Sequence, residues 1–402
     1  MSKINDLIAE HCPEGVEFKQ LEELLVYQQP TKFIVKTTNY DKSFNTPVLT
    51  AGQTFILGYT DERDGIYNAT IENPVIIFDD FTTSFHWVDF PFKIKSSAMK
   101  MIRPANGDNI GFRYIYYAMK CILYKPQDHA RQWISIYSKI SIPFPPIEIQ
   151  EEIVRILDNF TALEAELEAE LEVRKRQYEY YRSKLLSFSD IATGGGQNDC
   201  KSVGYVECKT LGEIAFYPRK RVSFDILNEQ TYVGVENLLQ DKKGVKHSSY
   251  MPKEGHFIEF IKGDILIGNI RPYLKKIWKA GYSGGTNGDV VVIRLNEEFT
   301  HKIYSTYLYY LLSADEFFSY NMQFAKGAKM PRGDKNSIMK YKIPIPSLEK
   351  QECIVSILDK FDALVNDISV GLPAEILARR QQYEYYRGKL LTFQPLVTPA
   401  VS

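Results

Sequence analysis

The sequence predicts an α+β protein in which two α+β domains are joined by two long helices that form an antiparallel coiled coil, with a pseudo-two-fold internal repeat. Three observations predict this fold. One block of sequence occurs twice along the chain. Within that block, apolar residues recur every three or four positions, as they do in coiled coils. Each block also follows about 140 residues of short β-like runs separated by Gly, Asn and Asp turns.

The composition is that of a folded globular protein. The chain has 402 residues, of which 44% are hydrophobic and 25% are charged, so it is long enough for two or more domains. No run approaches the roughly 18 apolar residues of a membrane span, and the first residues lack a signal-peptide pattern. We therefore expect a cytoplasmic protein with no membrane association.

The repeated block is long and specific. Residues 142–160 recur as 343–361 at an offset of 201, and residues 177–188 recur as 382–393 at an offset of 205. The second copy has thus gained four residues, about one helical turn, which returns the apolar face to the same side. The predicted segments are a first domain over 1–142, a first helix over 143–188, a flexible linker over 189–204, a second domain over 205–343, a second helix over 344–393 and a C-terminal tail over 394–402.

The apolar positions of the two helices define a coiled-coil seam. Gly371 and Pro373 predict a kink or a short break in the second helix, with Pro373 in the first turn of a new segment. The prolines near 143–146 and 344–346 end the preceding strand and direct the chain into each helix. The residues that we expect to form the seam are Ile153, Phe160, Leu163, Leu167, Leu171, Ile357, Phe361, Leu364, Ile368 and Ile376.

The two domains contain several predicted strands and helices. Apolar β-like runs occur at 54–57 and 74–78 in the first domain, and at 264–267 and 290–293 in the second. Short helices are predicted near 113–123 and 304–312. These patterns predict a compact α+β fold for each domain.

Motifs of enzymes are missing from the sequence. It contains no G-x-x-x-x-G-K-[ST], G-x-G-x-x-G, G-x-S-x-G, H-E-x-x-H or [DN]-P-P-[YF] pattern. Asp79 and Asp80 suggest a metal-dependent nuclease, but no Glu-x-Lys follows, and a local turn is the favoured interpretation. We therefore predict no catalytic residues, no metal site and no cofactor in this chain.

The cysteines give no metal-binding pattern either. They lack the C-x-x-C spacing and the nearby histidines of a zinc site. We expect reduced and mostly buried thiols at Cys12, Cys121, Cys200, Cys208 and Cys353.

The formal net charge is -1, but the charge is unevenly distributed. Residues 205–343 hold 21 Lys and Arg against 15 Asp and Glu, whereas residues 1–142 hold 15 against 16 and residues 143–188 hold 6 against 10. The overall charge therefore does not exclude a nucleic-acid partner.

Basic residues in loops are the best candidates for a functional surface. Arg131 and Arg332 occupy equivalent positions at the offset of 201, as do Lys139 and Lys340. Lysine and arginine gain affinity for a duplex by releasing counterions from its phosphates, although a simple solvated loop remains the alternative. Tyr27, Tyr59, Tyr217 and Tyr273 are further candidates for base contacts. The predicted DNA-binding residues are Arg131, Lys139, Arg219, Lys220, Arg221, Arg271, Lys275, Lys326, Lys329, Arg332, Lys335 and Lys340.

This layout resembles the specificity (S) subunit of type I restriction-modification systems. The resemblance rests on the I-P-x-P, Q-E-x-I-V-x-I-L-D-x-F and Q-Y-E-Y-Y-R-x-K-L-L motifs that occur in both copies. The segments GDILIGNIRPYL at 263–274 and TPVLTAG at 46–52 also resemble parts of the target recognition domains of that family. The resemblance covers almost the whole chain.

The resemblance implies a non-catalytic reader of double-stranded DNA. Each target recognition domain would read one half of a split, asymmetric site, and the helices would set the gap between the halves. Two methylation (M) subunits and the restriction (R) subunits would be the partners. They would carry the S-adenosylmethionine, ATP and Mg that this chain is not expected to bind.

The predicted length of the first helix is consistent with a role in setting the gap between two half-sites. A helix over residues 151–188 is about 57 Å long, which exceeds the roughly 34 to 36 Å of one duplex turn. One alternative is a coiled-coil adaptor that binds only proteins, but it does not explain the duplicated domains with their matched arginines. The other alternative, a fused enzyme with its own methyltransferase, is disfavoured by the missing motifs.

Overall fold

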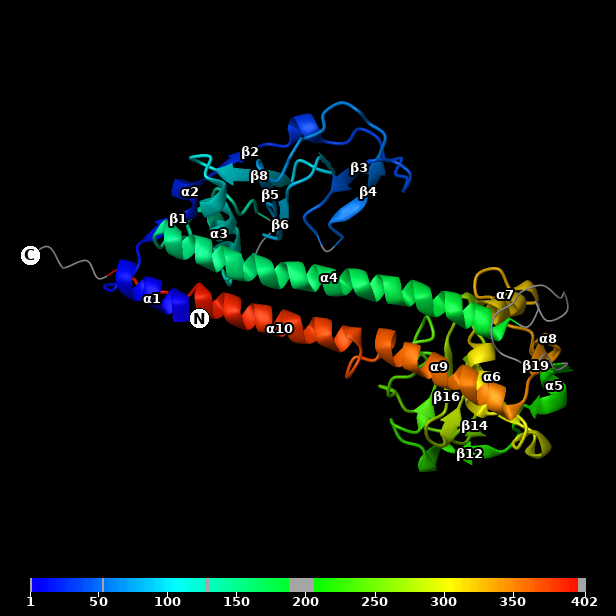
Figure 1. Ribbon diagram of the computed structural model, residues 1–402. Helices are drawn as coiled ribbons and strands as arrows, with labels where there is room; N and C mark the ends of the chain where they lie inside the picture. Colours follow the sequence, from blue (N-terminus) through cyan, green and yellow to red (C-terminus); the bar gives the residue numbers. More distant parts are fainter. Residues whose placement is uncertain (1, 53, 128–129, 188–205, 397–402) are drawn as a thin grey trace, which may run out of the picture. The chain divides into compact units, whose positions relative to one another are not determined.

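The computed structural model describes residues 2–52, 54–127, 130–187 and 206–396. The chain divides into two compact units, Met1–Glu166 with Ile376–Ser402 and Leu167–Glu375, which we call unit 1 and unit 2. Each unit contains one α+β domain and two helical segments that lie side by side (Figure 1). The predicted linker over 189–204 lies outside the described residues.

The domain of unit 1 is built on an antiparallel four-stranded sheet with the strand order β2-β8-β5-β6. A three-stranded sheet, β4-β3-β7, and the pair β1-β9 complete it. The elements are α1 (Ser2–His11), β1 (Phe18–Gln20), α2 (Leu21–Leu24), β2 (Leu25–Gln28), β3 (Thr46–Leu49), β4 (Ile56–Thr60), β5 (Val75–Asp79), β6 (Phe85–Val88), β7 (Lys93–Ile94), β8 (Met99–Pro104), α3 (Asn109–Met119), β9 (Ser141–Pro143) and α4 (Ile147–Leu186).

The domain of unit 2 has a similar architecture. Its sheets have the orders β11-β18-β15-β16 and β12-β14-β17-β13, with the additional pair β10-β19. The elements are β10 (Glu207–Thr210), α5 (Leu211–Ile214), β11 (Ala215–Phe216), β12 (Arg221–Ser223), β13 (Tyr232–Val233), β14 (His256–Phe260), β15 (Ile265–Gly268), β16 (Ile277–Lys279), β17 (Gly284–Thr286), β18 (Val290–Leu295), α6 (Ser305–Leu312), α7 (Asp315–Gln323), α8 (Lys335–Ile338), β19 (Lys342–Ile345) and α9 (Leu348–Asn366). The part of α4 from Leu167 on also belongs to unit 2, whereas the last helix, α10 (Leu372–Leu390), belongs to unit 1 from Ile376 on.

The central strand of each domain carries an apolar run that lies between two cores. In β5, Ile76 and Phe78 face the core that contains α3, whereas Val75 and Ile77 face the core beside β3 and β7. Successive side chains of a strand point to opposite faces, so an uninterrupted apolar run is buried on both sides. β15 repeats this arrangement in unit 2, where Ile265 and Leu266 belong to different cores.

The second repeat block forms two helices instead of one. α9 ends at Asn366 and α10 begins at Leu372, which confirms the predicted break. Pro373 is the second residue of α10, where the missing N–H costs no intrahelical bond. Gly371 closes the turn because a side chain there would collide with the carbonyl oxygens of Ala363 and Leu364. α4, by contrast, is one uninterrupted helix of 40 residues.

The helices pack in pairs within each unit. In unit 1, the ring of Phe160 on α4 stacks on Tyr386 of α10, and Glu164 accepts a hydrogen bond from Arg380. The later residue of α4 thus meets the earlier residue of α10, so the two segments are antiparallel. In unit 2, the ring of Phe361 on α9 stacks on Tyr178 and Tyr181 of α4.

The buried face of the helices differs in part from the predicted seam. Ile368 is 78% exposed in the turn between α9 and α10, because the chain has already left the helix at Asn366. Leu157, Leu358 and Val365 are buried although they were not predicted, because α3 and α6 cover a second side of the helices beside each domain. Of the predicted seam, Ile153 and Ile376 are buried, Phe160, Leu167, Leu171, Ile357 and Phe361 are half-buried, and Leu163 and Leu364 are exposed.

Two tyrosines of α3 connect the first domain to α4, the helix that follows it, by hydrogen bonds that we call the joint of this domain. The hydroxyl of Tyr114 donates to the carbonyl of Pro143 at 2.9 Å, and the hydroxyl of Tyr117 donates to the carboxylate of Asp158 on α4. Burial raises the pKa of both phenols, so both remain protonated donors at neutral pH.

The second domain repeats this joint. Tyr307 on α6 donates to the carbonyl of Pro344 at 3.0 Å, and Tyr310 donates to Asp359 on α9 at 2.5 Å. The three-residue spacing places both hydroxyls on one face of α6. The repeated prolines and aspartates of the sequence are therefore the acceptors of the two joints.

The last described residues of the chain belong to unit 1. The amide of Val16 donates to the carbonyl of Gln394, and the amide of Leu396 donates to the carbonyl of Val16, both at 2.9 Å. Leu390 and Leu391 also share a core with Ile4 of α1. Unit 1 is therefore assembled from both ends of the described sequence.

The structure also tests the predictions made for the cysteines, for the secondary structure and for a membrane span. Cys12 is buried, but Cys208 and Cys353 are exposed, so the expectation of mostly buried thiols is wrong for these two; Cys200 lies outside the described residues. α7 was not predicted from the sequence, and β4 begins two residues after the start of the predicted run at 54–57. In the described part of the chain, no helix has both the length and the apolarity needed to cross a membrane.

We predict that Tyr117→Phe and Tyr310→Phe each lower the free energy of unfolding by about 1 to 3 kcal/mol, because each removes a hydrogen bond to a charged acceptor. Urea denaturation followed by tryptophan fluorescence measures this, since Trp87 and Trp133 lie in unit 1 and Trp278 lies in unit 2. The exposed Tyr385 provides the control variant Tyr385→Phe, which should leave stability unchanged. Equal stability of all three variants would contradict the role assigned to the joints.

Candidate nucleic-acid interface

Two predicted basic segments of the second domain come together in the structure. The amide of Arg271 donates to the carbonyl of Pro331 at 2.7 Å, and the amide of Gly333 donates to the carbonyl of Asn269 at 3.1 Å. Residues 269–276, between β15 and β16, therefore lie directly beside residues 326–335.

Residues 326–332 form a narrow loop that presents three exposed cations, of which Lys326 and Arg332 lie at its two ends. Lys326 and Arg332 exchange backbone hydrogen bonds, both of 2.9 Å. Their side chains are 84% and 61% exposed and lie 3.6 Å from Asp334 and 3.1 Å from Asp289, respectively. Exposed ion pairs of this kind contribute little free energy, so a DNA phosphate can replace either carboxylate.

The neighbouring turn has an unusual backbone. Arg271 and Lys275 have φ angles of +52° and +50°, in the left-handed region that residues other than glycine adopt at a cost of roughly 1 to 2 kcal/mol each. Between them, Pro272 is buried and Tyr273 is half exposed. The turn thus presents Arg271 and Tyr273 to the outside.

A third basic segment lies close to these two. The hydroxyl of Tyr217 donates to the carbonyl of Lys335 at 2.8 Å, which brings the start of β12 near the 326–335 segment. Arg219, Lys220 and Arg221 are all exposed there. The ammonium of Lys220 lies 2.7 Å from Glu259, and Arg221 donates to the carbonyl of His256.

In the first domain, Arg131 occupies a comparable position. It is exposed and precedes Gln132, whose amide donates to the carbonyl of Asp80 at 2.8 Å. Asp80 follows β5, just as Ile270, which forms a β-bridge with Arg332, follows β15. In both domains the equivalent arginine therefore lies beside the turn that ends the central strand.

Asp79 and Asp80 make local contacts, as expected for a turn rather than for a metal-dependent nuclease site. One carboxylate oxygen of Asp79 accepts hydrogen bonds from the amides of Phe81 and Thr82 at 2.8 and 3.0 Å. Asp80 is buried and lies 3.4 Å from the buried ammonium of Lys100. Across residues 2–52, 54–127, 130–187 and 206–396, no group of three or more His, Cys, Asp or Glu is placed to hold a metal ion.

The remaining predicted cations are placed differently. Lys139 and Lys340 are exposed just before β9 and β19, and Lys329 is exposed in the 326–335 segment. Lys275 lies 2.9 Å from Asp315 at the start of α7, so it pairs within the protein. Asp315 and Asp289 were not identified from the sequence, because a carboxylate gives no local signal that it will pair with a distant cation.

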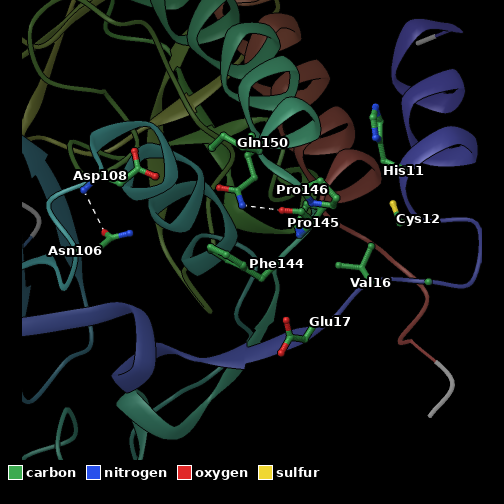
Figure 2. A pocket seen from close by; sticks show the side chains of 12 residues that line it. His11, Cys12, Val16, Glu17, Asn106, Asp108, Phe144, Pro145, Pro146 and Gln150 are labelled. Atoms are coloured by element: carbon green, nitrogen blue, oxygen red, sulfur yellow. Dashed lines mark hydrogen bonds between the residues drawn. The ribbon is translucent and has the colours of Figure 1, made fainter. Parts of the chain in front are cut away.

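A hollow of about 530 Å³ lies at the start of α4 in unit 1 (Figure 2). Within it, the side-chain amide of Gln150 donates to the carbonyl of Pro145 at 2.7 Å, and Gln351 repeats this bond to Pro346 in unit 2. The residues that line the hollow, all from the described part of unit 1, include Glu17 and Asp108 but no lysine or arginine. This hollow is therefore part of the joint between domain and helix and does not suit a phosphate.

Comparison with known proteins identifies the family. The family model described as "Type I restriction modification DNA specificity domain" matches residues 13–173 and 206–378. A specificity subunit of the type I restriction enzyme EcoR124I/EcoR124II from Escherichia coli is 39% identical in an alignment of 409 positions that covers 94% of each chain.

Solved structures show the same fold at low sequence identity. The S subunit of a type I restriction-modification system from M. genitalium has a TM-score of 0.55 at 15% identity, over 94% of this chain and 96% of that one. A chain from a structure concerned with complex assembly and conformational transition of the type I R-M system has a TM-score of 0.50 at 16% identity, over 94% and 97%.

Each matched region spans one domain and the first part of the repeated block that follows it, and together the two regions cover most of the chain. The alternative of an adaptor that binds only proteins is therefore not favoured. With its duplicated domains, repeated joints and long helices, the chain belongs to the family of type I restriction-modification DNA specificity subunits.

Proposed function

We propose that this chain reads a bipartite, asymmetric site on double-stranded DNA, with one half-site read by each domain and the spacer set by the helices. One observation carries the proposal. The equivalent arginines Arg131 and Arg332 are both exposed beside the turn that ends the central strand of their domain. A matched pair of cations on two copies of one fold suits the repeated phosphates of a duplex.

The charge of the second domain supports this function. Residues 205–343 carry six more basic than acidic residues, and three basic segments gather at one site. Phosphate contacts by Lys326, Arg332 and Arg219 would position the domain on the duplex. Arg271 and Tyr273, which project from the strained turn, would then reach base edges in the major groove.

The helices offer surfaces for partner subunits. Tyr180 on α4 and Tyr385 on α10 occupy equivalent positions in the repeat and are 60% and 63% exposed. Exposed aromatic side chains of this kind are common in protein interfaces. Two equivalent surfaces would suit two methylation subunits.

Catalysis would then belong to other chains of the complex. The methylation subunits and the restriction subunits would supply S-adenosylmethionine, ATP, Mg and all bond-breaking steps, while this chain works as a non-catalytic subunit in the cytoplasm. The sequence contains neither the [DN]-P-P-[YF] motif of amino-methyltransferases nor the G-x-x-x-x-G-K-[ST] phosphate loop, which supports this division.

The proposal can be tested by expressing the chain with its methylation subunits and mapping methylated adenines in genomic DNA. A split motif with two fixed halves and a spacer of constant length is the expected result. Methylation at a contiguous motif, or DNA binding that is independent of sequence, would contradict the proposal.

Arg131→Ala and Arg332→Ala should each weaken DNA binding and reduce its salt dependence, by about one unit of the log-log slope for each phosphate that the variant no longer neutralises. The measurement is a binding titration of the complex at several salt concentrations. Lys175→Ala is a matched control, because Lys175 is an exposed cation that pairs with Glu172 on α4. Unchanged slopes in correctly folded arginine variants would exclude phosphate contacts by these two residues.

An insertion tests the role of α4. Four residues added after Glu168 lengthen the helix by about 6 Å and largely keep its buried face, because they add about one turn. We expect the preferred spacer to lengthen by one or two base pairs while both half-sites stay the same, since base pairs are spaced by about 3.4 Å.

Methylome sequencing of a strain with this insertion measures the result. A two-residue insertion is the control, because it rotates the following residues by about 200° and should damage the complex. A changed half-site, or an unchanged spacer with full activity, would show that α4 does not set the spacing.

A further inference from the structure

The turn Arg271–Lys275 is held from two sides by backbone hydrogen bonds. On one side, the amide of Arg271 donates to the carbonyl of Pro331. On the other side, the amides of Asp241 and Lys242 donate to the carbonyls of Leu274 and Lys275, both at 3.0 Å. Asp241 and Lys242 are themselves left-handed, with φ angles of +55° and +63°. Four left-handed residues in two adjoining turns persist only where their surroundings fix them.

Ion pairs complete the anchor of this turn. One carboxylate oxygen of Asp315 lies 2.9 Å from the ammonium of Lys275, and the other lies 3.1 Å from the ammonium of Lys242. Lys242 also lies 3.6 Å from Glu179 on α4. Burial raises the pKa of Asp315, but the two lysines outweigh it and hold the pKa below its ordinary value. The turn is thus connected through Asp315 to α7 and through Lys242 to α4.

We propose that Asp315 and Lys242 are positioning residues that hold the turn Arg271–Lys275 in the shape needed to read the bases of the second half-site. This inference rests on the proposed function of the second domain. It also gives Lys275 a different role from the predicted phosphate contact, because its ammonium anchors the turn from inside the protein.

Base readout depends on placement more strongly than phosphate binding does. A donor reaches a specific base edge only within a narrow geometry, whereas a flexible cation can follow a phosphate. A turn with left-handed residues at both ends relaxes when its anchor is removed, which displaces Arg271 and Tyr273. Lys326 and Arg332 also have contacts outside this turn, to each other and to Asp334 and Asp289, so we expect both to continue to bind the DNA backbone. Removal of the anchor should therefore reduce discrimination between sequences more than total affinity.

The first domain provides an internal reference. Its corresponding turn also contains a left-handed residue, Thr83, with a φ angle of +57°. There the stabilising carboxylate is Asp79, which belongs to the turn itself. A change at Asp315 should therefore affect the second half-site and leave the first unchanged.

The experiment uses the complex of the full chain with its methylation subunits and three duplexes. One duplex carries the methylated motif found in the genome, and the others carry a substituted first or second half-site. Discrimination at a half-site is the dissociation constant of the duplex with that half-site substituted, divided by that of the duplex with the genomic motif. In Asp315→Asn, this ratio for the second half-site should fall by about tenfold, which is roughly the effect of a single mismatched base pair. The ratio for the first half-site should not change.

Two further variants separate positioning from general loss of structure. Asp315→Glu keeps the charge and should restore discrimination to within about twofold of the unchanged protein. Glu316→Gln alters the next residue of α7, whose carboxylate accepts a hydrogen bond from Ser183 on α4, and should have no effect. Lys242→Gln serves if Asp315→Asn does not fold, because it keeps the pair between Lys275 and Asp315. It should cause a smaller loss of discrimination at the second half-site.

The possible failures are distinguishable. Unchanged discrimination at the second half-site, or an equal loss at both half-sites, would overturn the positioning role while leaving DNA reading intact. A wild-type complex that does not discriminate at either half-site would overturn the proposed function itself.

Discussion

Each domain depends on a joint of buried tyrosine hydroxyls that fix it to its own helix. Tyr114 and Tyr117 in the first domain, and Tyr307 and Tyr310 in the second, donate to a proline carbonyl and to an aspartate of the helix. A buried hydroxyl without an acceptor is costly, so the domain cannot turn on its helix without losing these bonds. A rigid joint is what allows the position of a helix to determine the position of a domain.

This joint explains why the helical part of the repeat is so similar in its two copies, while the domains differ. Asp158 and Asp359 lie in the repeated I-L-D-x-F motif, and Gln150 and Gln351 begin the repeated Q-E motif. These residues have partners in the joint, so their chemistry is constrained in both copies. The exposed surface of each domain makes no part of this joint, so its residues can differ between the two copies.

Local patterns in the sequence predicted much of the architecture. The two repeats, the central strands β5 and β15 and the break before Pro373 all depend on spacing or on a residue type within a few positions. Contacts between distant segments were not predictable. Ile368 matched the helical spacing but lies in a turn, because a helix boundary overrides periodicity. The same limit applied to the candidate site, where the pairing of Lys275 with Asp315 required the fold, since the two residues come from different elements of the second domain.

The division of the chain into units has a consequence for synthesis on the ribosome. Unit 2 is one continuous segment, whereas unit 1 needs Leu390 and Leu391 beside Ile4 in its core and Gln394 beside Val16. Domains generally fold as units when their residues become available. The unit that contains the start of the described sequence therefore completes its core last, after the other unit has been made, and the nascent first domain must remain soluble without its final helix until then.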